Sequence, residues 1–520
     1  MYTGEQLWKS YINEELIFKD IDAKKQIRTY KDLPDSIYLA FSETAQKSPD
    51  KVAVTDDGGV QYTYCQLAER VFAFSHTLHF DKGIEEGEHV GIMMYNSIDF
   101  CTVFLALNKL GCVVVPLPTK FKKDEITQLT KKAEITAVIS HGDFTDYFDG
   151  CDKVICISEF KDICGCDDTP TRKNPGALAL LMFTSGTTSQ SKVVTITNYN
   201  ITHAVVSYCK TLGITEEDKA ILPVPIYLVT GLVAIFGLMM YAGGSVYLNK
   251  FFDAERVLSD IEKYGITFFH ASPTVFTMIL EKKDKFPELP TLKMFACGSS
   301  NMPPDKIKQL HNWLPDSSFH TVYGLTETTS PGTIFPVDAS TSEFIGSSGI
   351  PVPGLEFKIV DDEGEELPAK EEGRVLVRGS NITTGYYKLD TPAYKDGWLD
   401  TGDIGYFNEQ GYIYIVDRRK DMINRGGEKI CSFDVENALT DIEGITDAAV
   451  FGIPNDLYGE VPVAVIKTAE DFDFDEEQIR IRLKGRMASY KIPVKIKVVD
   501  EIPVTLNMKT DKKKLRQMFS

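Results

Sequence analysis

The stretch LMFTSGTTSQSKVV, residues 181–194, decides the fold more than any other part of the chain. It begins as the apolar end of a strand, continues through six small or hydroxylated residues, and then reaches Lys192. Small side chains let backbone N–H groups and hydroxyls approach an anion closely, so this loop is suited to hold phosphate. The G-x-x-x-x-G-K-[ST] spacing of a Walker loop is absent. Taken by itself, the segment leaves a Ser/Thr-rich surface turn open as the alternative.

Apolar strand-like runs alternate with helical runs on both sides of this loop. HVGIMM, CVVVPL and ITAVIS have the pattern of strands, DEITQLTKKAEI that of a helix, and ALALLMFTSG, GSVYLN, ITFFHAS and LKMFACG continue the series. Such alternation predicts parallel sheets with helices packed on both faces. Between residues 346 and 416, short alternating strands with Gly and Pro turns predict a small β-rich subdomain.

We therefore expect an α/β protein with a large N-terminal domain, residues 1–419, and a small mobile α+β C-terminal domain, residues 420–520. The large domain should contain two doubly wound α/β subdomains, residues 1–175 and 176–345, and the β-rich subdomain, residues 346–419. The charged run DRRK that ends at Lys420 is the expected hinge. No tandem repeat and no low-complexity segment occurs in the sequence.

Composition excludes several classes of function. A chain of 520 residues with 43% hydrophobic and 25% charged residues is globular and has enough material for more than one domain. A net charge of −19 without a basic patch argues against binding to nucleic acid or an anionic membrane. The polar N-terminus lacks the core of a secretory signal and the ten cysteines form no CxxC pair, so we expect a cytoplasmic location.

Two segments raise the question of a metal site and of a membrane span. Cys151, Cys156, Cys164 and Cys166 are close in sequence but lack the paired spacing of a zinc site, so no metal is expected there. Residues 221–241 are uncharged over the length of a bilayer span. Because prolines and a glycine crowd the first half of this segment, we expect a loop and then a buried helix from about Gly231, not a membrane span.

Further motifs follow the phosphate loop in a fixed order. They are TVYGLTETTS at residues 321–330, TGDIGYFNEQGYIYIVD at residues 401–417, and RRKDMINRGGEKI directly after it. In order and spacing they resemble the motifs of the acyl-adenylate-forming superfamily, which includes acyl-CoA synthetases, peptide-synthetase adenylation domains and luciferases. The resemblance covers nearly the whole chain, from SPDKVAVTDDGGVQYTYCQLAER to EIPVTLNMKTDKKKLR.

The resemblance implies an acid–thiol ligase, closest in pattern to the AMP-forming acyl-CoA synthetases. Such an enzyme converts a carboxylic acid and ATP to acyl-AMP and pyrophosphate, and then passes the acyl group to a thiol, here expected to be CoA. A carrier-protein phosphopantetheine is the alternative acceptor. A non-catalytic nucleotide-binding protein is the alternative from a different class, although such a protein has no need of a bridging lysine.

The same resemblance implies roles for residues at the nucleotide. The residues that would hold the phosphates are Thr184, Ser185, Gly186, Thr187, Thr188 and Lys192. Glu327 would coordinate Mg²⁺, with Thr326 close to the α-phosphate. Tyr323 would pack against adenine, and Asp403 and Arg418 would hold the ribose hydroxyls. Without the family context these residues could equally be a core aromatic, a helix-start carboxylate, an Asx-turn residue and an exposed cation.

Lys509 falls where the family places a lysine that bridges the attacking carboxylate and the α-phosphate, a task suited to a mobile point charge. The alternative is a solvated lysine in a basic tail. In the family's second step the C-terminal domain rotates about a hinge that aligns with Lys420. The loop that would then enter the site, where glycines permit close approach, consists of Gly426, Gly427, Glu428 and Lys429.

The sequence departs from the family pattern at several positions. In the phosphate loop, Ser189, Ser191 and Val193 replace a Gly, a Pro and a Gly, and Met508 replaces a Gly before Lys509. These changes affect the expected rate more than the reaction class.

The resemblance and the composition of one segment also bear on the carboxylic acid that the enzyme would use. By resemblance, the wall of its pocket consists of His203, Tyr227, Leu228, Thr230, Cys297 and Gly298, with Leu228 where acyl-CoA synthetases often have a His. Of these, His203 and Cys297 are expected to pack and not to take part in the chemistry. No Asp lies between residues 223 and 241 to pair with an α-ammonium group, so the tail of the acid should be uncharged. A medium-chain fatty acid or an aromatic acid fits this pocket.

Overall fold

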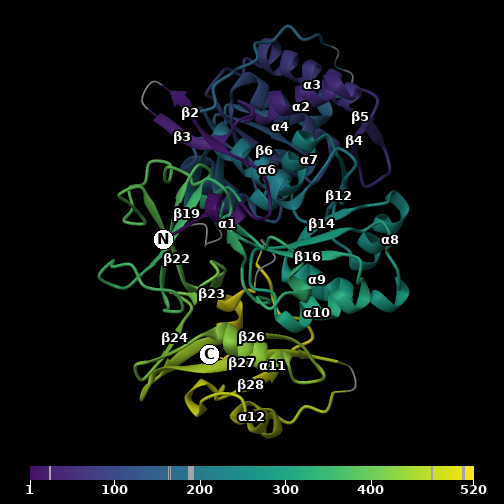
Figure 1. Cartoon of the computed structure of the whole chain (residues 1–520). Coiled ribbons are helices and arrows are strands. Elements are labelled where there is room, and N and C mark those ends of the chain that lie inside the picture. The colour runs from purple at the N-terminus through teal and green to yellow at the C-terminus, as the bar shows by residue number, and fades with distance from the viewer. Residues whose placement is uncertain are drawn as a thin grey trace.

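The computed structural model describes residues 1–22, 25–161, 163, 165–184, 192–469, 472–505 and 510–519. It is an α/β structure with a large N-terminal part and a small C-terminal part, as predicted (Figure 1). In the described residues the large part contains three sheets of six or more strands, and the small part contains a five-stranded sheet. A separate hairpin, β2 (Leu16–Asp22) with β3 (Lys25–Tyr30), packs against the large part.

The first large sheet has the strand order β11-β10-β7-β6-β8-β9. Its members are β6 (His89–Met93), β7 (Val113–Pro116), β8 (Ala137–Ser140), β9 (Lys153–Cys156), β10 (Leu178–Phe183) and β11 (Val193–Thr197). All neighbours pair in parallel except β10 with β11. Strands β7 and β8 are buried along their whole length, as expected for parallel strands covered on both faces.

A helix between β6 and β7 illustrates how the local sequence sets the fold. Helix α4 (Ile98–Leu110) begins where the Ser97 hydroxyl accepts a hydrogen bond from the Phe100 amide. It ends at Gly111, whose left-handed backbone suits glycine. Most of α4 is buried, and one side of it packs against α3 (Tyr64–His76).

The second large sheet has nine strands in the order β18-β17-β16-β15-β14-β12-β13-β4-β5. They are β4 (Val52–Thr55), β5 (Gln61–Thr63), β12 (Lys219–Leu222), β13 (Ser245–Leu248), β14 (Phe268–Ala271), β15 (Met294–Cys297), β16 (Ser318–Tyr323), β17 (Thr333–Ile334) and β18 (Ile350–Pro351). On one face Phe269 packs against Phe276 of α9 (Pro273–Leu280), and on the other His270 packs against Tyr208 of α6 (Asn198–Leu212). Helices therefore cover both faces, as the sequence predicted.

The two sheets do not divide at residue 175. Strands β4 and β5 come from the beginning of the chain but extend the nine-stranded sheet, and β10 and β11 complete the six-stranded sheet instead. The expected subdomains 1–175 and 176–345 therefore exchange strands. The reason is that β4 pairs with β13 across nearly two hundred residues, and such pairing leaves no local signal in the sequence.

The β-rich subdomain is the third large sheet. Its strands are β1 (Tyr2–Thr3), β19 (Leu355–Val360), β20 (Gly373–Gly379), β21 (Tyr394–Lys395), β22 (Trp398–Phe407) and β23 (Ile413–Arg418). The pairs are antiparallel, and β1 brings the N-terminus of the chain to this sheet.

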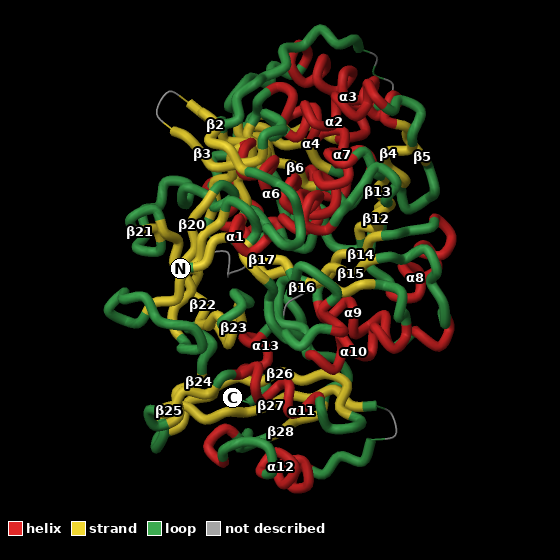
Figure 2. The backbone as a smooth tube through the Cα atoms, in the orientation of Figure 1, coloured by secondary structure: helices red, strands yellow, loops and turns green. Residues whose placement is uncertain are grey.

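The C-terminal part forms one sheet with its own core. Its elements are β24 (Ile423–Arg425), β25 (Glu428–Ile430), α11 (Ser432–Thr440), β26 (Ile445–Asn455), β27 (Gly459–Thr468), α12 (Glu476–Lys484), β28 (Ile496–Val498) and α13 (Lys512–Gln517). Val435, Leu439, Val450 and Ile466 are buried together there, whereas the main core of the large part ends at Ile413. Figure 2 shows this sheet below the large part, with β24 and β25 at one end.

The apolar segment 221–241 is a loop followed by a buried helix, as expected. Strand β12 ends at Leu222, and the π-helical turn η4 (Thr230–Gly237) continues into α7 (Leu238–Ala242). Among the helices in the described ranges, none combines the length and apolar character needed to cross a membrane.

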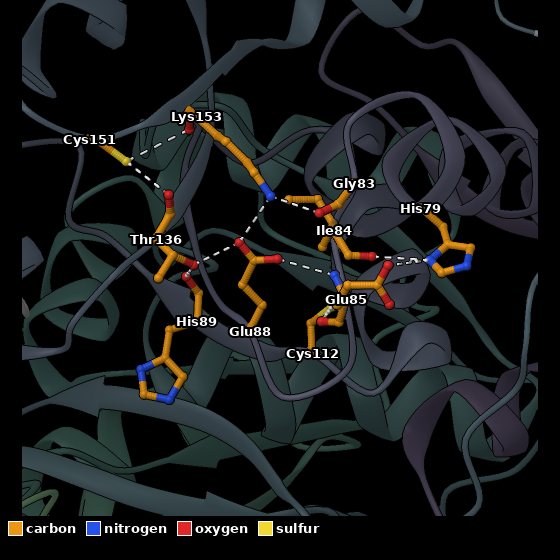
Figure 3. Close-up of polar contacts among 10 residues, drawn as sticks. All are labelled: His79, Gly83, Ile84, Glu85, Glu88, His89, Cys112, Thr136, Cys151 and Lys153. Atoms are coloured by element: carbon orange, nitrogen blue, oxygen red, sulfur yellow. Dashed lines mark hydrogen bonds and ion pairs between the residues drawn. The ribbon is translucent and has the colours of Figure 1, made fainter.

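A polar network around Glu88 links strands β6, β8 and β9 at one edge of the first large sheet (Figure 3). The Glu88 carboxylate accepts hydrogen bonds from the Thr136 hydroxyl at 2.9 Å and the Glu85 amide at 3.1 Å, and pairs with Lys153 at 3.4 Å. The thiols of Cys112 and Cys151 donate to backbone carbonyls here. Within the described ranges no group of His, Cys, Asp or Glu is arranged to hold a metal ion. Cys164 lies outside those ranges.

Candidate active site

A cavity of about 820 Å³ lies between the large and the small part. From the large part it is lined by the ends of β10 and β16, the loop before η4, and strands β22 and β23. From the small part it is lined by α11, by residues on either side of the undescribed segment 506–509, and by α13. Of the residues expected at the nucleotide, Thr184, Tyr323, Asp403 and Arg418 line this cavity, although they come from segments up to more than two hundred residues apart.

Tyr323, Asp403 and Arg418 form one connected group at the cavity. The Tyr323 hydroxyl donates to Asp403 Oδ2 at 2.6 Å. Asp403 and Arg418 are register partners on β22 and β23, and Arg418 Nε lies 3.5 Å from Asp403 Oδ1. Burial and, after it, the Asp403 charge raise the pKa of Tyr323, so its phenol stays a donor. A buried carboxylate oriented in this way can accept hydrogen bonds from a sugar diol.

Two hydrogen bonds hold the two ends of the phosphate loop close to each other. The Thr184 amide donates to the Lys192 carbonyl at 3.0 Å, and the Lys192 amide donates to Thr184 Oγ1 at 3.1 Å. Thr184 lines the cavity, and Val193 pairs with Phe183 in the strands that flank the loop. Residues 185–191 lie outside the described ranges, and they include Ser185, Gly186, Thr187, Thr188, Ser189 and Ser191.

Thr326 and Glu327 begin a short 3₁₀ turn, η6 (Thr326–Thr328), just beyond the lining of the cavity. The Glu327 carbonyl accepts a hydrogen bond from the Thr383 amide at 2.9 Å. Its carboxylate accepts one from the Tyr386 hydroxyl at 2.7 Å. Glu327 is thus held by its backbone and by one carboxylate oxygen, and such a carboxylate is an oxygen ligand suited to Mg²⁺.

Two of the six residues expected at the acid, Tyr227 and Leu228, line the cavity. The buried Tyr227 hydroxyl has no hydrogen-bond partner among the described residues. Thr230 begins η4, and Cys297 and Gly298 lie at and just beyond the end of β15; these three are outside the lining. Burial raises the pKa of the Cys297 thiol, consistent with a packing role.

His203 lies in the core of the large part and not at the cavity wall expected for it. One ring nitrogen bonds Thr29 Oγ1 at 2.7 Å and the other lies 2.9 Å from the Pro353 carbonyl. Burial lowers its pKa to about 4, so the ring is neutral. The sequence did not reveal this because α6 is buried over most of its surface and periodicity could not say which face meets the pocket.

The residues of the hinge and the C-terminal part that are expected to act in the two steps do not all lie at the cavity. Lys420 lines the cavity, whereas Lys509 and Met508 lie outside the described ranges. Gly426 and Gly427 form the turn between β24 and β25 with positive φ at both positions, which glycine adopts without strain. This turn and the following Glu428 and Lys429 do not line the cavity.

The structure adds site residues that the sequence analysis missed. Glu436 and Lys512 line the cavity from the small part, 3.8 Å apart, and Lys512 donates to the Ser432 hydroxyl at 2.8 Å. Burial raises the pKa of Glu436 to about 7, although Lys512 opposes the shift. Tyr386 is the other addition. Nothing in the run TTGYYKLD distinguishes it from Tyr387, and only the fold places it beside Glu327.

Comparison with known proteins identifies the family. Residues 41–387 match the model of the AMP-binding enzymes, and residues 434–509 match the AMP-binding enzyme C-terminal domain. The chain belongs to the AMP-binding enzyme family. It is accordingly an enzyme, an AMP-forming acid–thiol ligase, as its motifs implied. ATP, Mg²⁺ and CoA, the expected cofactors, are those of such ligases.

Similar proteins cover almost the full length of the chain. A 2-succinylbenzoate–CoA ligase of Listeria monocytogenes is 32% identical over 91% of this chain and 97% of its own. An oxalate–CoA ligase of Arabidopsis thaliana is 29% identical over 93% of this chain and 99% of its own. Both act with CoA, so these relatives give no support to a carrier-protein acceptor.

Solved structures agree with this family membership. The o-succinylbenzoate coenzyme A synthetase of Bacillus subtilis, in complex with ATP and magnesium ion, has a TM-score of 0.83 and 26% identity, over 92% of this chain and 99% of its own. ATP-bound MatB from Rhodopseudomonas palustris has a TM-score of 0.86 at 24% identity, over 94% of this chain and 99% of its own. The second match bears on the fold.

Proposed function

We propose that this enzyme joins a carboxylic acid with an uncharged tail to CoA in two steps through acyl-AMP. In the first step a carboxylate oxygen attacks the α-phosphorus of ATP and pyrophosphate leaves. In the second the CoA thiol attacks the acyl carbon and AMP leaves. The observation that carries the proposal is the Tyr323–Asp403–Arg418 group, which presents an oriented carboxylate at the cavity for a ribose.

The nucleotide would occupy the cavity along this group. Asp403 and Arg418 hold the ribose, and the Tyr323 ring packs against adenine while its hydroxyl fixes Asp403. The loop that begins at Thr184 and ends at Lys192 holds the departing phosphates, with Thr326 close to the α-phosphate. Glu327 is the carboxylate available to Mg²⁺, which would neutralise phosphate charge when bound.

Among the described residues, the walls that remain for the acid carry no basic side chain. Phe183, Tyr227, Leu228 and Val322 line the cavity, as do the uncharged Ser299, Ser300 and Asn301, and the basic groups of the lining belong to the β23 end and the small part. A buried anionic tail needs a cationic partner, so these walls favour an aromatic or medium-chain acid. The unpartnered Tyr227 hydroxyl could bind one polar group on such an acid. A feruloyl-CoA synthase, 28% identical to this chain, acts on an aromatic acid.

The second step requires a movement of the small domain. The Gly426–Gly427 turn does not line the cavity, yet it is the segment expected to form the thiol channel. Rotation of residues 420–520 about Lys420 would exchange Lys509, which serves adenylation, for this turn.

The nine described cysteines are free thiols, which supports the cytoplasmic location proposed from the sequence.

Product analysis tests the proposal. The enzyme is incubated with ATP, Mg²⁺ and a panel of aromatic, fatty, dicarboxylic and amino acids, with and without CoA. We expect pyrophosphate, AMP and an acyl-CoA thioester with aromatic or medium-chain acids. An acyl-AMP that never becomes a thioester would refute CoA as the acceptor, and a clear preference for dicarboxylic acids would refute the acid class.

A further inference from the structure

Tyr386 lies between the two charged side chains that frame the expected phosphate site. Its hydroxyl donates a hydrogen bond to Glu327 Oε1 at 2.7 Å. The Nζ atom of Lys192 lies 4.5 Å from the centroid of the same ring, within the range of a cation–π contact. One buried side chain therefore touches both the carboxylate expected to hold Mg²⁺ and the lysine at the end of the phosphate loop.

The backbone of Tyr386 is tied to the strand that follows the phosphate loop. Tyr386 forms an antiparallel bridge with Val194, and the next amide, of Tyr387, donates to the Val193 carbonyl at 2.8 Å. Both partners belong to β11, which begins directly after Lys192. A shift of the tyrosine would therefore be a shift relative to the end of the phosphate loop.

The ring is fixed from the other side by the segment that supports Glu327. Tyr394 packs edge-on against Tyr386 with ring centroids 5.7 Å apart, and the Tyr394 hydroxyl lies 2.6 Å from Thr383 Oγ1. Thr383 in turn donates its amide to the Glu327 carbonyl. Glu327 is thus held by its backbone through Thr383 and by its carboxylate through Tyr386.

We propose that Tyr386 is a positioning residue for the metal–nucleotide complex, which orients the Glu327 carboxylate and fixes its distance from Lys192. The proposal rests on the function proposed above. The terminal torsion of a glutamate is broad, so a carboxylate without a fixed partner samples many orientations. A hydrogen bond to one oxygen restricts that rotation and leaves the second oxygen for the metal ion.

The neighbouring tyrosine provides a matched control. The Tyr387 hydroxyl also donates to a glutamate, Glu134 Oε2, at 2.7 Å, but on the outside of the protein. Tyr387→Phe therefore removes the same kind of hydrogen bond from the next residue without touching Glu327. Tyr386→Phe keeps the ring under Lys192 and the packing on Tyr394, so both variants should fold.

The test measures metal binding without turnover. Mn²⁺ is titrated into the full-length protein with α,β-methylene-ATP, and free Mn²⁺ is followed by electron paramagnetic resonance, corrected for Mn²⁺ bound by the analogue alone. We expect Tyr386→Phe to raise the apparent Kd for Mn²⁺ by about 10- to 100-fold, the usual effect of losing a hydrogen bond to a metal ligand. Tyr387→Phe should match the wild type.

A double variant separates positioning from a general structural effect. In a Glu327→Gln background, Tyr386→Phe should cause little additional loss of Mn²⁺ affinity, because the hydrogen bond acts through the carboxylate. Wild-type Mn²⁺ affinity in Tyr386→Phe, or full additivity with Glu327→Gln, would overturn the proposal. If the wild-type protein itself binds no Mn²⁺ with the analogue, the proposed function fails before this inference is reached.

Discussion

The Tyr323 hydroxyl donates a 2.6 Å hydrogen bond to Asp403 Oδ2, which joins the end of β16 to the middle of β22. Two sheets separated by eighty residues in sequence thus meet at one carboxylate. Because Arg418 lies on the other oxygen of that carboxylate, Asp403 has little freedom to turn away from the cavity. In this account the ribose site is preorganised by the protein before the nucleotide binds.

Removal of this hydrogen bond should weaken ATP binding. A hydrogen bond to a charged group contributes about 1.5–3 kcal/mol, so Tyr323→Phe should raise the KM for ATP about tenfold or more. The kcat should change little, because the ring remains against adenine. Steady-state pyrophosphate release measures both values. Tyr406→Phe, which changes a tyrosine on the same strand that stacks on Tyr414, is the control. An unchanged KM in Tyr323→Phe would show that Asp403 does not need this donor.

His203 should contribute to stability and not to the choice of acid. His203→Ala leaves the Thr29 hydroxyl and the Pro353 carbonyl without their partner, which should lower the free energy of unfolding by about 2–4 kcal/mol. The ranking of acids by kcat/KM should stay as in the wild type. Tyr227→Ala, at the cavity wall, should change the ranking. If His203→Ala changes the ranking, its ring does reach the acid.

Glu436 should make the protein less stable as the pH rises. Its pKa is about 7 in the folded chain, above that of an unfolded glutamate, so the folded state holds more protons between these values. Stability therefore falls as pH rises through this window and levels off above it.

Glu436→Gln, which can still accept the hydrogen bond from the Val450 amide, removes the titration. Urea unfolding at about pH 5.5 and about pH 7.5 should show a smaller loss of stability in the variant, with Lys512, Asp417 and Asp447 unchanged as neighbours. Equal pH dependence in both proteins would argue against a raised pKa at Glu436.

The two half-reactions should depend on different lysines. Lys509→Ala should suppress acyl-AMP formation, because the bridging charge is lost, while thioester formation from supplied acyl-AMP largely survives. Lys420→Pro should do the reverse, because it restricts the hinge and leaves the adenylation residues intact. Single-turnover assays of each half-reaction compare the variants. Equal losses in both half-reactions for both variants would contradict the division of roles.

The sequence predicted the parts of the fold that are encoded locally. The apolar runs ALALLMFTSG and ITFFHAS were predicted to contain strands, and the structure has interior strands there, at Leu178–Phe183 and Phe268–Ala271. The exchange of β4 into the nine-stranded sheet escaped detection, because its partner Val246 is remote in sequence. Long-range pairing depends on the whole chain and has no short signature.

The site residues also separate into those that the local sequence revealed and those that only the fold revealed. Tyr323, Asp403 and Arg418 lie in motifs with recognisable spacing, and the structure brings them together. His203 was expected at the pocket wall but lies in the core, because a helix buried over most of its surface does not reveal which neighbour each side meets. Tyr386 could not be distinguished from Tyr387, since the difference between them comes from backbone pairing with β11, which is remote in sequence.

The central claim, that the acid is activated as acyl-AMP, has one direct test. An acid that the enzyme accepts is labelled with a heavy oxygen isotope in both oxygens of its carboxylate. It is incubated with enzyme, ATP, Mg²⁺ and CoA, and the mass of the nucleotide product is measured by mass spectrometry. We expect AMP carrying one labelled oxygen, because the attacking carboxylate oxygen stays on the α-phosphate when the thiol attacks the acyl carbon and the acyl C–O bond breaks. Unlabelled AMP, or ADP with the label in inorganic phosphate, would contradict it.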